Sequence, residues 1–284
     1  MSKSEIDRDG FQTVKTKRIS KHKQTKIPSK DVEFKKQDVV VDIDKVKFIT
    51  CILFYFRRIQ DAVQELRLST YLEDVNKSVS SILQARNTVE IICLGLGHIS
   101  ECNISKYQLA LLLSLKYQCN AQKVLVHDPI FYKSECEILK QLGIEVILEN
   151  YEGNYVISDN GVSIVYLPHC PKQLTNNFLW ANWGLNLENC VLICNSFTSL
   201  IDNQTSRILS KTVPYIFKIF PHTTEHILEN SFKFTDIFND TSIHTFPEKN
   251  LCKVDANFWI KADKPTYENT EEFITSLMVE KLNI

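Results

Sequence analysis

A short apolar run, Ile91 to Leu94, ends at two closely spaced glycines, Gly95 and Gly97. This pattern predicts a buried strand that enters a tight turn. In open α/β sheets, ligands bind beside such turns, at the carboxyl ends of parallel strands. The dinucleotide fingerprint is incomplete, because Ser100 replaces its third glycine and the next helix signal starts about eight residues after Gly97. The turn therefore predicts either a nucleotide or adenosyl-cofactor pocket or a glycine turn with a structural role only.

Other polar residues follow predicted strands and would lie at the same sheet edge. Asp128 can hydrogen-bond a ribose hydroxyl there, but Asp128-Pro129 also fits a helix N-cap followed by proline, which we favour. His169 and Cys170 have the types of a general base and a nucleophile, or they belong to a rigid loop. Neighbours in an extended segment point in opposite directions, so they make no ready dyad. The candidate ligand pocket consists of Gly95, Gly97, His98, Asp128, His169 and Asn195.

A second group combines indoles, carboxamides and a histidine. The indoles and amides can stack on and hydrogen-bond a flat ligand or a peptide, or they can seal a helix against the sheet. Asp240 and His244, four residues apart, indicate either a carboxylate-oriented histidine or a turn or cap. The candidate partner or ligand surface consists of Trp180, Asn182, Trp183, Asp240 and His244.

We predict no metal site and assign no catalytic residue. His222 and His226 have i, i+4 spacing on a possible helix, but they lack a third ligand. The nine cysteines include no CxxC pair, and Cys190 and Cys194 lie about 13 Å apart if they share a strand. An odd number of thiols without a secretion signal predicts free cysteines in a reducing compartment.

Strand and helix signals alternate between residues 91 and 211, which predicts a mainly parallel sheet. Asn160-Gly161 predicts a hairpin between Tyr155–Ile157 and Ser163–Tyr166. Ser105 and Gln108 resemble a capping box for the helix at Tyr107–Tyr117. Further strands are predicted at Ile91–Leu94, Lys123–His127, Glu145–Leu148 and Asn189–Asn195, and further helices after Asp128-Pro129 up to Gly143, at Lys172–Trp183 and at Leu200–Lys211.

The fold class expected is α/β, a Rossmann-like, mainly parallel sheet with flanking helices. Residues 1–42 are predicted to form a disordered basic arm, residues 43–88 a helical segment packed on the core, and residues 89–284 the Rossmann-like domain with a C-terminal extension. Residues 1–37 contain eleven Lys or Arg against five Asp or Glu. This arm is either a solubilising tail or a nuclear-import or polyanion-binding tail with weak contacts. No apolar run approaches the ~18 residues of a membrane span, so we expect no membrane contact.

Eight segments occur in an order that resembles the Sensitivity-to-Red-Light-Reduced-like family. Residues Asp9–Val14, which precede a basic stretch, also look like members of that family. The shared domain would span roughly Glu90 to Pro247. The eight segments are Ile92–Gly97, Ser105–Ala110, Asp128–Phe131, Leu142–Val146, Leu167–Cys170, Asn177–Trp183, Asn195–Phe197 and Phe238–Pro247.

The resemblance implies regulatory biology. Plant relatives act in light signalling and the circadian clock, animal relatives are associated with clock-gene expression and control of haem biosynthesis, and a fungal relative is linked to microtubule-drug sensitivity. It implies no reaction or cofactor, so no catalytic residue transfers. The chain is therefore expected to be an intracellular regulatory protein, cytoplasmic or nuclear, with protein partners. The alternatives are an adenosyl-cofactor-dependent transferase or other nucleotide-binding enzyme, and a peptide-binding module that uses Trp180 and Trp183.

Overall fold

The computed structural model describes residues 43–267. The predicted basic arm at residues 1–42 lies outside this range, as does the end of the predicted C-terminal extension at residues 268–284. Within residues 43–267, no helix has both the length and the apolar character needed to span a membrane.

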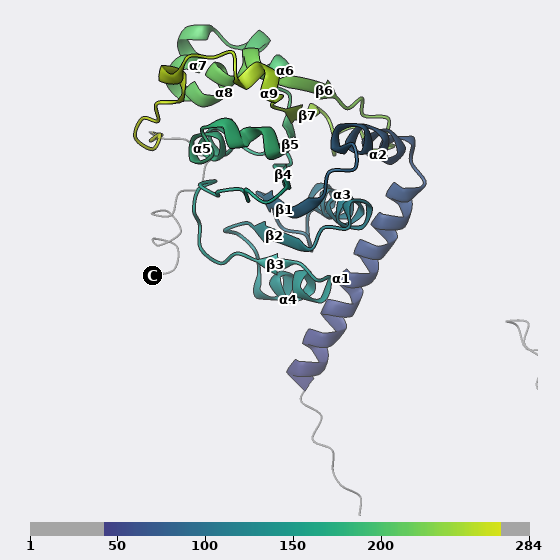
Figure 1. The fold of residues 1–284 in the computed structure, drawn as a ribbon. Helices are drawn as coiled ribbons and strands as arrows, with labels where there is room; N and C mark the ends of the chain where they lie inside the picture. Colours follow the sequence, from purple (N-terminus) through teal and green to yellow (C-terminus); the bar gives the residue numbers. More distant parts are fainter. Residues whose placement is uncertain (1–42, 268–284) are drawn as a thin grey trace, which may run out of the picture. The chain divides into compact units, whose positions relative to one another are not determined.

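The described residues contain a seven-stranded sheet in the order β3-β2-β1-β4-β5-β7-β6 (Figure 1). Strands β1 to β5 pair in parallel, whereas β7 pairs antiparallel with both β5 and β6. The sheet is therefore mostly parallel, as the alternation of signals predicted. The strands are β1 (Thr88–Leu94), β2 (Lys123–His127), β3 (Glu145–Val146), β4 (Val162–Tyr166), β5 (Cys190–Asn195), β6 (Thr224–Ile227) and β7 (Thr241–Thr245).

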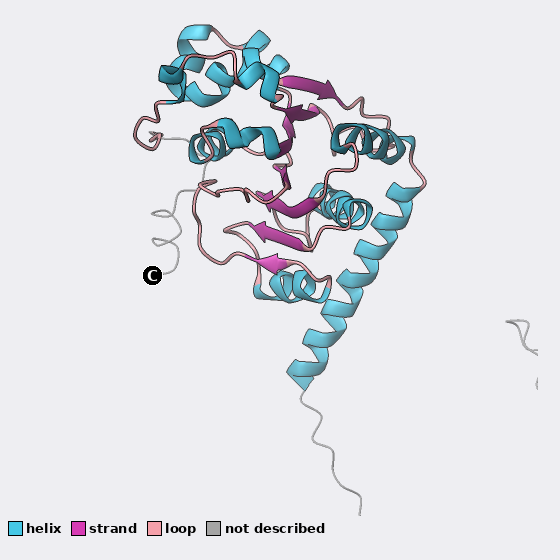
Figure 2. Cartoon of the chain, viewed as in Figure 1, coloured by secondary structure: helices cyan, strands magenta, loops and turns pink. Residues whose placement is uncertain are grey.

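Helices cover both faces of the sheet (Figure 2). The α-helices are α1 (Ile43–Arg67), α2 (Thr70–Leu83), α3 (Asn103–Cys119), α4 (Lys133–Gln141), α5 (Lys172–Ala181), α6 (Phe197–Asn203), α7 (Ser206–Thr212), α8 (Pro214–Ile219) and α9 (Glu248–Leu251). Short 3₁₀ helices are η1 (Leu185–Asn189), η2 (Phe220–His222) and η3 (Ala256–Trp259).

The second half of the central strand β1, Ile91–Leu94, is apolar without interruption because both of its faces are covered. Ile91 and Cys93 belong to the core that contains side chains of α1 to α4. Ile92 and Leu94 point to the opposite face and join the core formed with α5 to α9. Successive side chains of a strand alternate between faces, so these four residues fill both cores in turn, and each of them is apolar.

The predicted helical region from Asp44 to Arg86 forms two helices. Ser69 begins the second one, because its hydroxyl oxygen accepts the N–H of Leu72 at 3.2 Å. Helix α2 then buries Val75 and Val79 at i, i+4 spacing, and α1 buries Ile59 and Leu66 in the same core. The N-terminal helices thus pack on the core.

Both predicted caps near the glycine turn are wrong. Helix α3 begins at Asn103, so Ser105 lies inside the helix, and the Gln108 amide donates to the carbonyl of Ile237 at 3.4 Å. Helix α4 begins at Lys133 instead of Pro129, which removes Asp128 from any capping position. In both cases a polar side chain that the local pattern assigned to a helix end bonds a residue distant in the sequence: Gln108 bonds Ile237, and Asp128 bonds Gly97.

The predicted hairpin around Asn160-Gly161 is also wrong. Strand β4 pairs in parallel with β1 and β5, and the Tyr155–Ile157 segment is not a strand. The N–H of Ile157 donates to the side chain of Asn182 at 2.9 Å instead of to a strand partner. The predicted helix at Leu200–Lys211 is divided into α6 and α7.

Candidate functional site

Two adjoining cavities lie at the carboxyl ends of the parallel strands. We call the larger one, of about 360 Å³, the glycine-turn cavity. It is enclosed by the turn after β1, the first turn of α3, the segment after β2 and the loop after β4. Its lining includes Leu94, Gly95, Leu96, Gly97, Cys102, Ile104, Ser105, Gln108, His127, Asp128, Pro129, Ile130, Asn150, Gly153, Pro168, His169, Cys170, Pro171 and Leu174. A topological switch occurs here, between β1 with β2 on one side and β4 with β5 on the other.

Both glycines of the turn are required by the backbone. Gly95 has a φ of +74° and Gly97 one of +76°, in the left-handed region that favours glycine. A Cβ at Gly95 would lie 2.5 Å from the Cys170 sulfur, and one at Gly97 would lie 2.7 Å from the Ser105 hydroxyl oxygen. The close approach of α3 and of the loop after β4 to the turn therefore depends on these glycines.

Asp128 connects the turns after β1 and β2. Its Oδ2 accepts the N–H of Gly97 at 2.7 Å, and its Oδ1 accepts the N–H of Ile130 at 3.0 Å. The carboxylate is partly exposed at the cavity wall. Each carboxylate oxygen has a further acceptor position, so Asp128 can also take a hydrogen bond from a ligand hydroxyl.

His98 lies behind the turn and is not among the residues that line either cavity. Its ring stacks on Tyr132 at 4.1 Å between centroids, and its Nδ1 lies 3.1 Å from Glu135 Oε2. The buried Glu135 also accepts the N–H groups of Ser100 at 2.8 Å and Tyr132 at 2.9 Å. Burial opposes ionisation, but these donors lower the pKa of Glu135 below its ordinary value. Glu135 thus ties the glycine turn to the start of α4.

His169 and Cys170 contact different segments and form no dyad, but the predicted reason is wrong, because the chain at His169 is left-handed instead of extended. His169 adopts a φ of +49°, and its Nε2 lies 2.9 Å from the carbonyl oxygen of Asn239. The Cys170 thiol donates to the carbonyl of Leu94 at 3.1 Å. Burial, with a smaller contribution from the charge of Asp128, raises the pKa of Cys170. This thiol therefore resists ionisation, which weakens its candidacy as a nucleophile.

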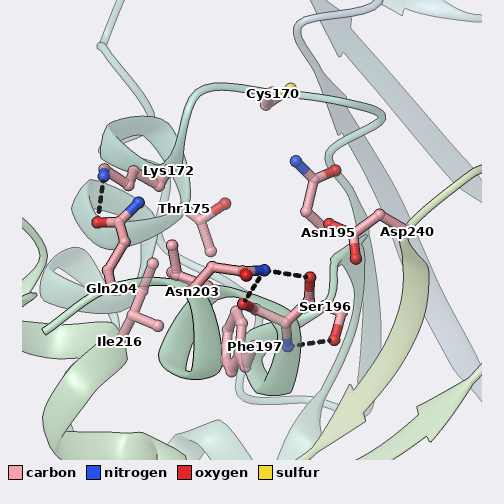
Figure 3. A pocket seen from close by; sticks show the side chains of 12 residues that line it. Cys170, Lys172, Thr175, Asn195, Ser196, Phe197, Asn203, Gln204, Ile216 and Asp240 are labelled. Carbon is pink, nitrogen blue, oxygen red and sulfur yellow. Dashed lines mark hydrogen bonds between the residues drawn. The ribbon is translucent and has the colours of Figure 1, made fainter.

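The second cavity, of about 220 Å³, lies at the ends of β4 and β5 (Figure 3). We call it the amide cavity because Asn195, Asn203 and Gln204 contribute to its lining; the other lining residues are Cys170, Lys172, Thr175, Ser196, Phe197, Ser199, Leu200, Ile216 and Asp240. Asn195 Oδ1 is buried without a hydrogen-bond partner among the described residues. Gly95, Gly97, Asp128 and His169 therefore share one cavity, Asn195 lines the adjoining one, and Cys170 lines both.

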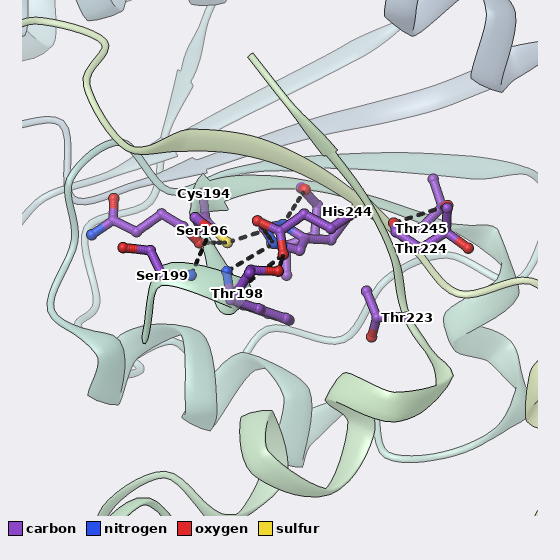
Figure 4. Close-up of polar contacts among 12 residues, drawn as sticks. Cys194, Ser196, Thr198, Ser199, Thr223, Thr224, His244 and Thr245 are labelled. Atoms are coloured by element: carbon purple, nitrogen blue, oxygen red, sulfur yellow. Dashed lines mark hydrogen bonds and ion pairs between the residues drawn. The ribbon is translucent and has the colours of Figure 1, made fainter. Parts of the chain in front are cut away.

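His244 lies in a buried polar cluster behind the amide cavity (Figure 4). Its Nε2 accepts the N–H of Phe197 at 3.3 Å and lies 3.5 Å from Glu225 Oε1. Of the two alternatives for Asp240 and His244, the structure favours the turn, because Asp240 has a φ of +53° before β7 and the carboxylate beside His244 is that of Glu225. Asp240 precedes β7 and lines the amide cavity.

Glu225 is the carboxylate of this cluster. Its Oε2 accepts both the N–H and the hydroxyl of Thr198, at 2.9 and 2.7 Å. Burial opposes ionisation, but interactions with His244, Ser196 and Thr198 lower the pKa of Glu225 well below 4.5. The cluster fixes the start of α6 against β7 and β6, and it thereby positions the turn after Asn195 at the end of β5.

The tryptophan group makes contacts within the chain. Trp183 Nε1 donates to the carbonyl of Phe258 at 2.9 Å, and Trp180 Nε1 donates to that of Ala262 at 2.8 Å. Asn182 donates to the carbonyl of Tyr155 at 2.7 Å and accepts from Ile157. These side chains attach the segment around η3 and the loop before β4 to helix α5.

The residues considered for metal binding are separated by secondary structure. His222 belongs to η2 and His226 to β6, so the predicted helical spacing is wrong. Between residues 43 and 267, no group of three or more His, Cys, Asp or Glu side chains is arranged to hold a metal ion.

Three important polar residues were not identified from the sequence: His127, Glu135 and Glu225. His127 ends β2 and is 8% exposed. Its Nδ1 donates to the carbonyl of Ile147 at 2.8 Å, and its Nε2 is buried without a hydrogen-bond partner among the described residues. His127 could have been found from its position beside Asp128 at the end of a predicted strand. In the sequence, Glu135 and Glu225 look the same as carboxylates on the protein surface.

Comparison with known proteins identifies the family. The family model described as the SRR1 domain matches residues 69–245. An SRR1-like protein from Drosophila melanogaster is 32% identical over 222 residues, which cover 77% of this chain and 78% of the relative. An SRR1-like protein from Mus musculus is 32% identical over 162 residues, or 56% and 64% of the two chains. Protein SENSITIVITY TO RED LIGHT REDUCED 1 from Arabidopsis thaliana is 25% identical over 127 residues, or 44% and 46%. These matches confirm the resemblance seen in the ordered sequence motifs, and the chain belongs to the SRR1 domain family.

Proposed function

We propose that this chain is an intracellular regulatory protein whose α/β domain binds a small nucleoside-type ligand in the glycine-turn cavity. The observation that carries the proposal is the hydrogen bond from Gly97 N–H to Asp128, at 2.7 Å, on the wall of that cavity. It brings a glycine turn and a strand-end carboxylate together at the topological switch, where doubly wound folds bind nucleotides. The order β3-β2-β1-β4-β5 supports assignment to the Rossmann-like folds.

The cavity offers complementary surfaces to the two parts of a nucleoside. Asp128 supplies acceptors for ribose hydroxyls. Leu96, Ile104 and Leu174 supply apolar surface for a base. Helix α3 begins six residues beyond Gly97, so the ligand does not require a pyrophosphate seated directly on that helix. An adenosyl compound without a diphosphate fits this arrangement better than a dinucleotide.

For biology, we propose a role in circadian and light-dependent gene expression and in the control of haem biosynthesis, in the cytoplasm and nucleus and through protein partners. Support comes from family membership and from the Arabidopsis relative, whose name refers to red-light sensitivity. Replacing the native gene by an Asp128→Ala allele tests whether the cavity matters for regulation. We expect altered rhythms of clock transcripts when expression of the variant is adjusted to the abundance of the native protein, and normal rhythms with normal haem synthesis would contradict the proposal.

The ligand proposal is tested by thermal unfolding with S-adenosylmethionine, S-adenosylhomocysteine, adenosine, NAD, ATP and haem. A ligand at one hundred times its Kd stabilises the native state by about 2.7 kcal/mol. We expect stabilisation by the adenosyl compounds and its loss in Asp128→Ala. If no nucleoside compound stabilises the protein at saturating concentration, the ligand proposal is wrong.

A second candidate function is an adenosyl-cofactor-dependent transferase. It is favoured by the amide cavity, because group transfer requires two molecules side by side and Cys170 lines both cavities. Conversion of S-adenosylmethionine to S-adenosylhomocysteine in the presence of a cell extract, followed by mass spectrometry, tests this function. No conversion by protein that binds the cofactor would favour the regulatory function.

A further inference from the structure

Cys102 lies on the wall of the glycine-turn cavity, at the start of helix α3. It lines the cavity, is partly exposed and is the N-cap residue of the 17-residue helix α3. The peptide N–H groups of the first helical turn point towards this end, where they favour negative charge. Cys102 is therefore accessible to a reagent and lies where a thiolate is stabilised.

The electrostatic environment distinguishes Cys102 from most other cysteines. Burial opposes its ionisation, but the Ser105 hydroxyl and the N–H groups of Ser105 and Ile104 lower the pKa of Cys102 below its ordinary value. Burial instead raises the pKa of Cys93, Cys119, Cys136, Cys170, Cys190 and Cys194. Because the thiolate is the reactive form, these six thiols are expected to react slowly.

An independent feature of the same cavity points to an occupant. His127 lines the wall formed by the end of β2, and its imidazole is held by the carbonyl of Ile147. Its Nε2 is buried with no hydrogen-bond partner among residues 43–267. Buried polar atoms in native proteins are normally paired, so this unpaired nitrogen, on a residue that lines the cavity, indicates a place for a water molecule or a ligand atom beside His127.

We propose that Cys102 is a covalent modification site that takes low-molecular-weight disulfides, and that its modification and occupation of the glycine-turn cavity exclude one another. The Cys102 thiolate attacks one sulfur of the disulfide. A new S–S bond forms to Cys102, the S–S bond of the reagent breaks, and its second sulfur leaves with the electron pair as a thiolate. No further oxidant is required.

The exclusion follows from the available space. The cavity has a volume of about 360 Å³, and Cys102 is part of its wall. A glutathionyl group attached to Cys102 would fill part of the volume that a nucleoside needs. This part of the inference rests on the proposed function and adds to it a thiol-dependent control of the same site.

The experiment uses the full chain and Ellman's reagent or glutathione disulfide at pH 6 to 8, with intact mass and peptide mass spectrometry as readouts. Cys102 is expected to react several-fold faster than Cys252, an exposed cysteine outside the cavity lining, with the larger ratio at pH 6. Saturating S-adenosylhomocysteine is expected to slow the reaction of Cys102 and to leave that of Cys252 unchanged.

Three variants distinguish the contribution of the Cys102 thiol itself from that of its neighbour Ser105 and from the reaction of another cysteine. Cys102→Ser removes the fast phase and preserves the fold, because serine is a preferred N-cap residue. Ser105→Ala keeps the thiol and is expected to slow its reaction at pH 6, whereas Cys252→Ser leaves the fast phase intact. Modification of Cys102 no faster than that of Cys252 would overturn the inference. If Cys102 reacts rapidly but no nucleoside stabilises the protein, the proposed ligand fails and the modification site stands; equal reaction with and without a bound nucleoside refutes the exclusion.

Discussion

The backbone N–H of Gly97 donates to the carboxylate of Asp128 over 2.7 Å, and this bond joins the turns that follow two neighbouring strands. Gly97 follows β1, whereas Asp128 follows β2, 31 residues later. The same carboxylate also accepts the N–H of Ile130. One side chain thus sets the shape of two cavity walls, and its removal has consequences for stability and binding together.

Asp128→Ala is expected to lower the free energy of unfolding by about 1–3 kcal/mol, because two backbone donors lose their acceptor. The loss of ribose contacts is expected to weaken binding of S-adenosylhomocysteine in parallel. Urea unfolding and calorimetric titration measure the two effects. Asp159→Ala, at an exposed loop position, is the matched control. Unchanged stability in Asp128→Ala would show that the bond to Gly97 contributes nothing.

Gly95→Ala is expected to destabilise the fold by about 1–3 kcal/mol, because alanine is strained at a φ of +74°. The added Cβ also meets the Cys170 sulfur at 2.5 Å. The control is Gly184→Ala, whose Cβ would find no atom within 4 Å and whose φ of 164° is extended. Adding Cys170→Ala to Gly95→Ala relieves the contact but not the backbone strain, so thermal unfolding should show partial recovery. Equal melting temperatures for Gly95→Ala and Gly184→Ala would contradict the steric argument.

Glu225 is expected to make stability depend on acid pH. Its pKa in the folded protein lies below the ordinary value of 4.5, so its contribution is complete at higher pH. That contribution is lost as the pH falls below about 4.5 towards the folded-state pKa, because the unfolded chain then binds the proton more readily. Glu225→Gln should cost about 1–3 kcal/mol at pH 7 and flatten the decline below pH 4.5. Urea titrations across pH measure this, with the exposed Glu229→Gln as control. A variant whose acid slope equals that of the native chain would rule out this role.

Deletion of residues 1–37 is expected to weaken any association with a polyanion such as heparin or duplex DNA. The deleted segment contains eleven Lys or Arg against five Asp or Glu, and each cationic contact releases counterions. The slope of log affinity against log salt concentration should therefore become shallower. A variant in which residues 1–37 are scrambled keeps the charge of the segment and changes its sequence, so it shows whether charge alone accounts for the association. An unchanged salt slope after deletion would show that the arm makes no such contact.

The parallel strands β1 and β2 were predictable because their sequence signal is strong. Ile91–Leu94 and Val124–Val126 are apolar runs bounded by polar residues or glycine, and they lie in β1 and β2. The local signals that failed were short turn and cap motifs. Asn160-Gly161 favours a tight turn, but the strand after it pairs in parallel with partners distant in the sequence. Strands β6 and β7 were not assigned because the pattern after Pro214 is mixed.

The candidate site was predictable only at its strand ends. Gly95, Asp128 and His169 share a cavity because parallel strands bring their carboxyl ends to one edge. The side chains that hold this edge in place escaped detection. Glu135 and Glu225 look like surface carboxylates in the sequence, and only the folded chain shows that backbone N–H groups surround them. Asp128 was assigned to the helix that follows because nothing local reveals Gly97 as its partner.

Cys170 is the one residue common to the linings of the glycine-turn and amide cavities. At this residue the two cavities are separated by a single side chain, which lies next to Gly95. A molecule that presses on this thiol from one side changes the room available on the other. The glycine-turn cavity and the amide cavity share this boundary, so the size of a ligand in one cavity limits the size of a ligand in the other.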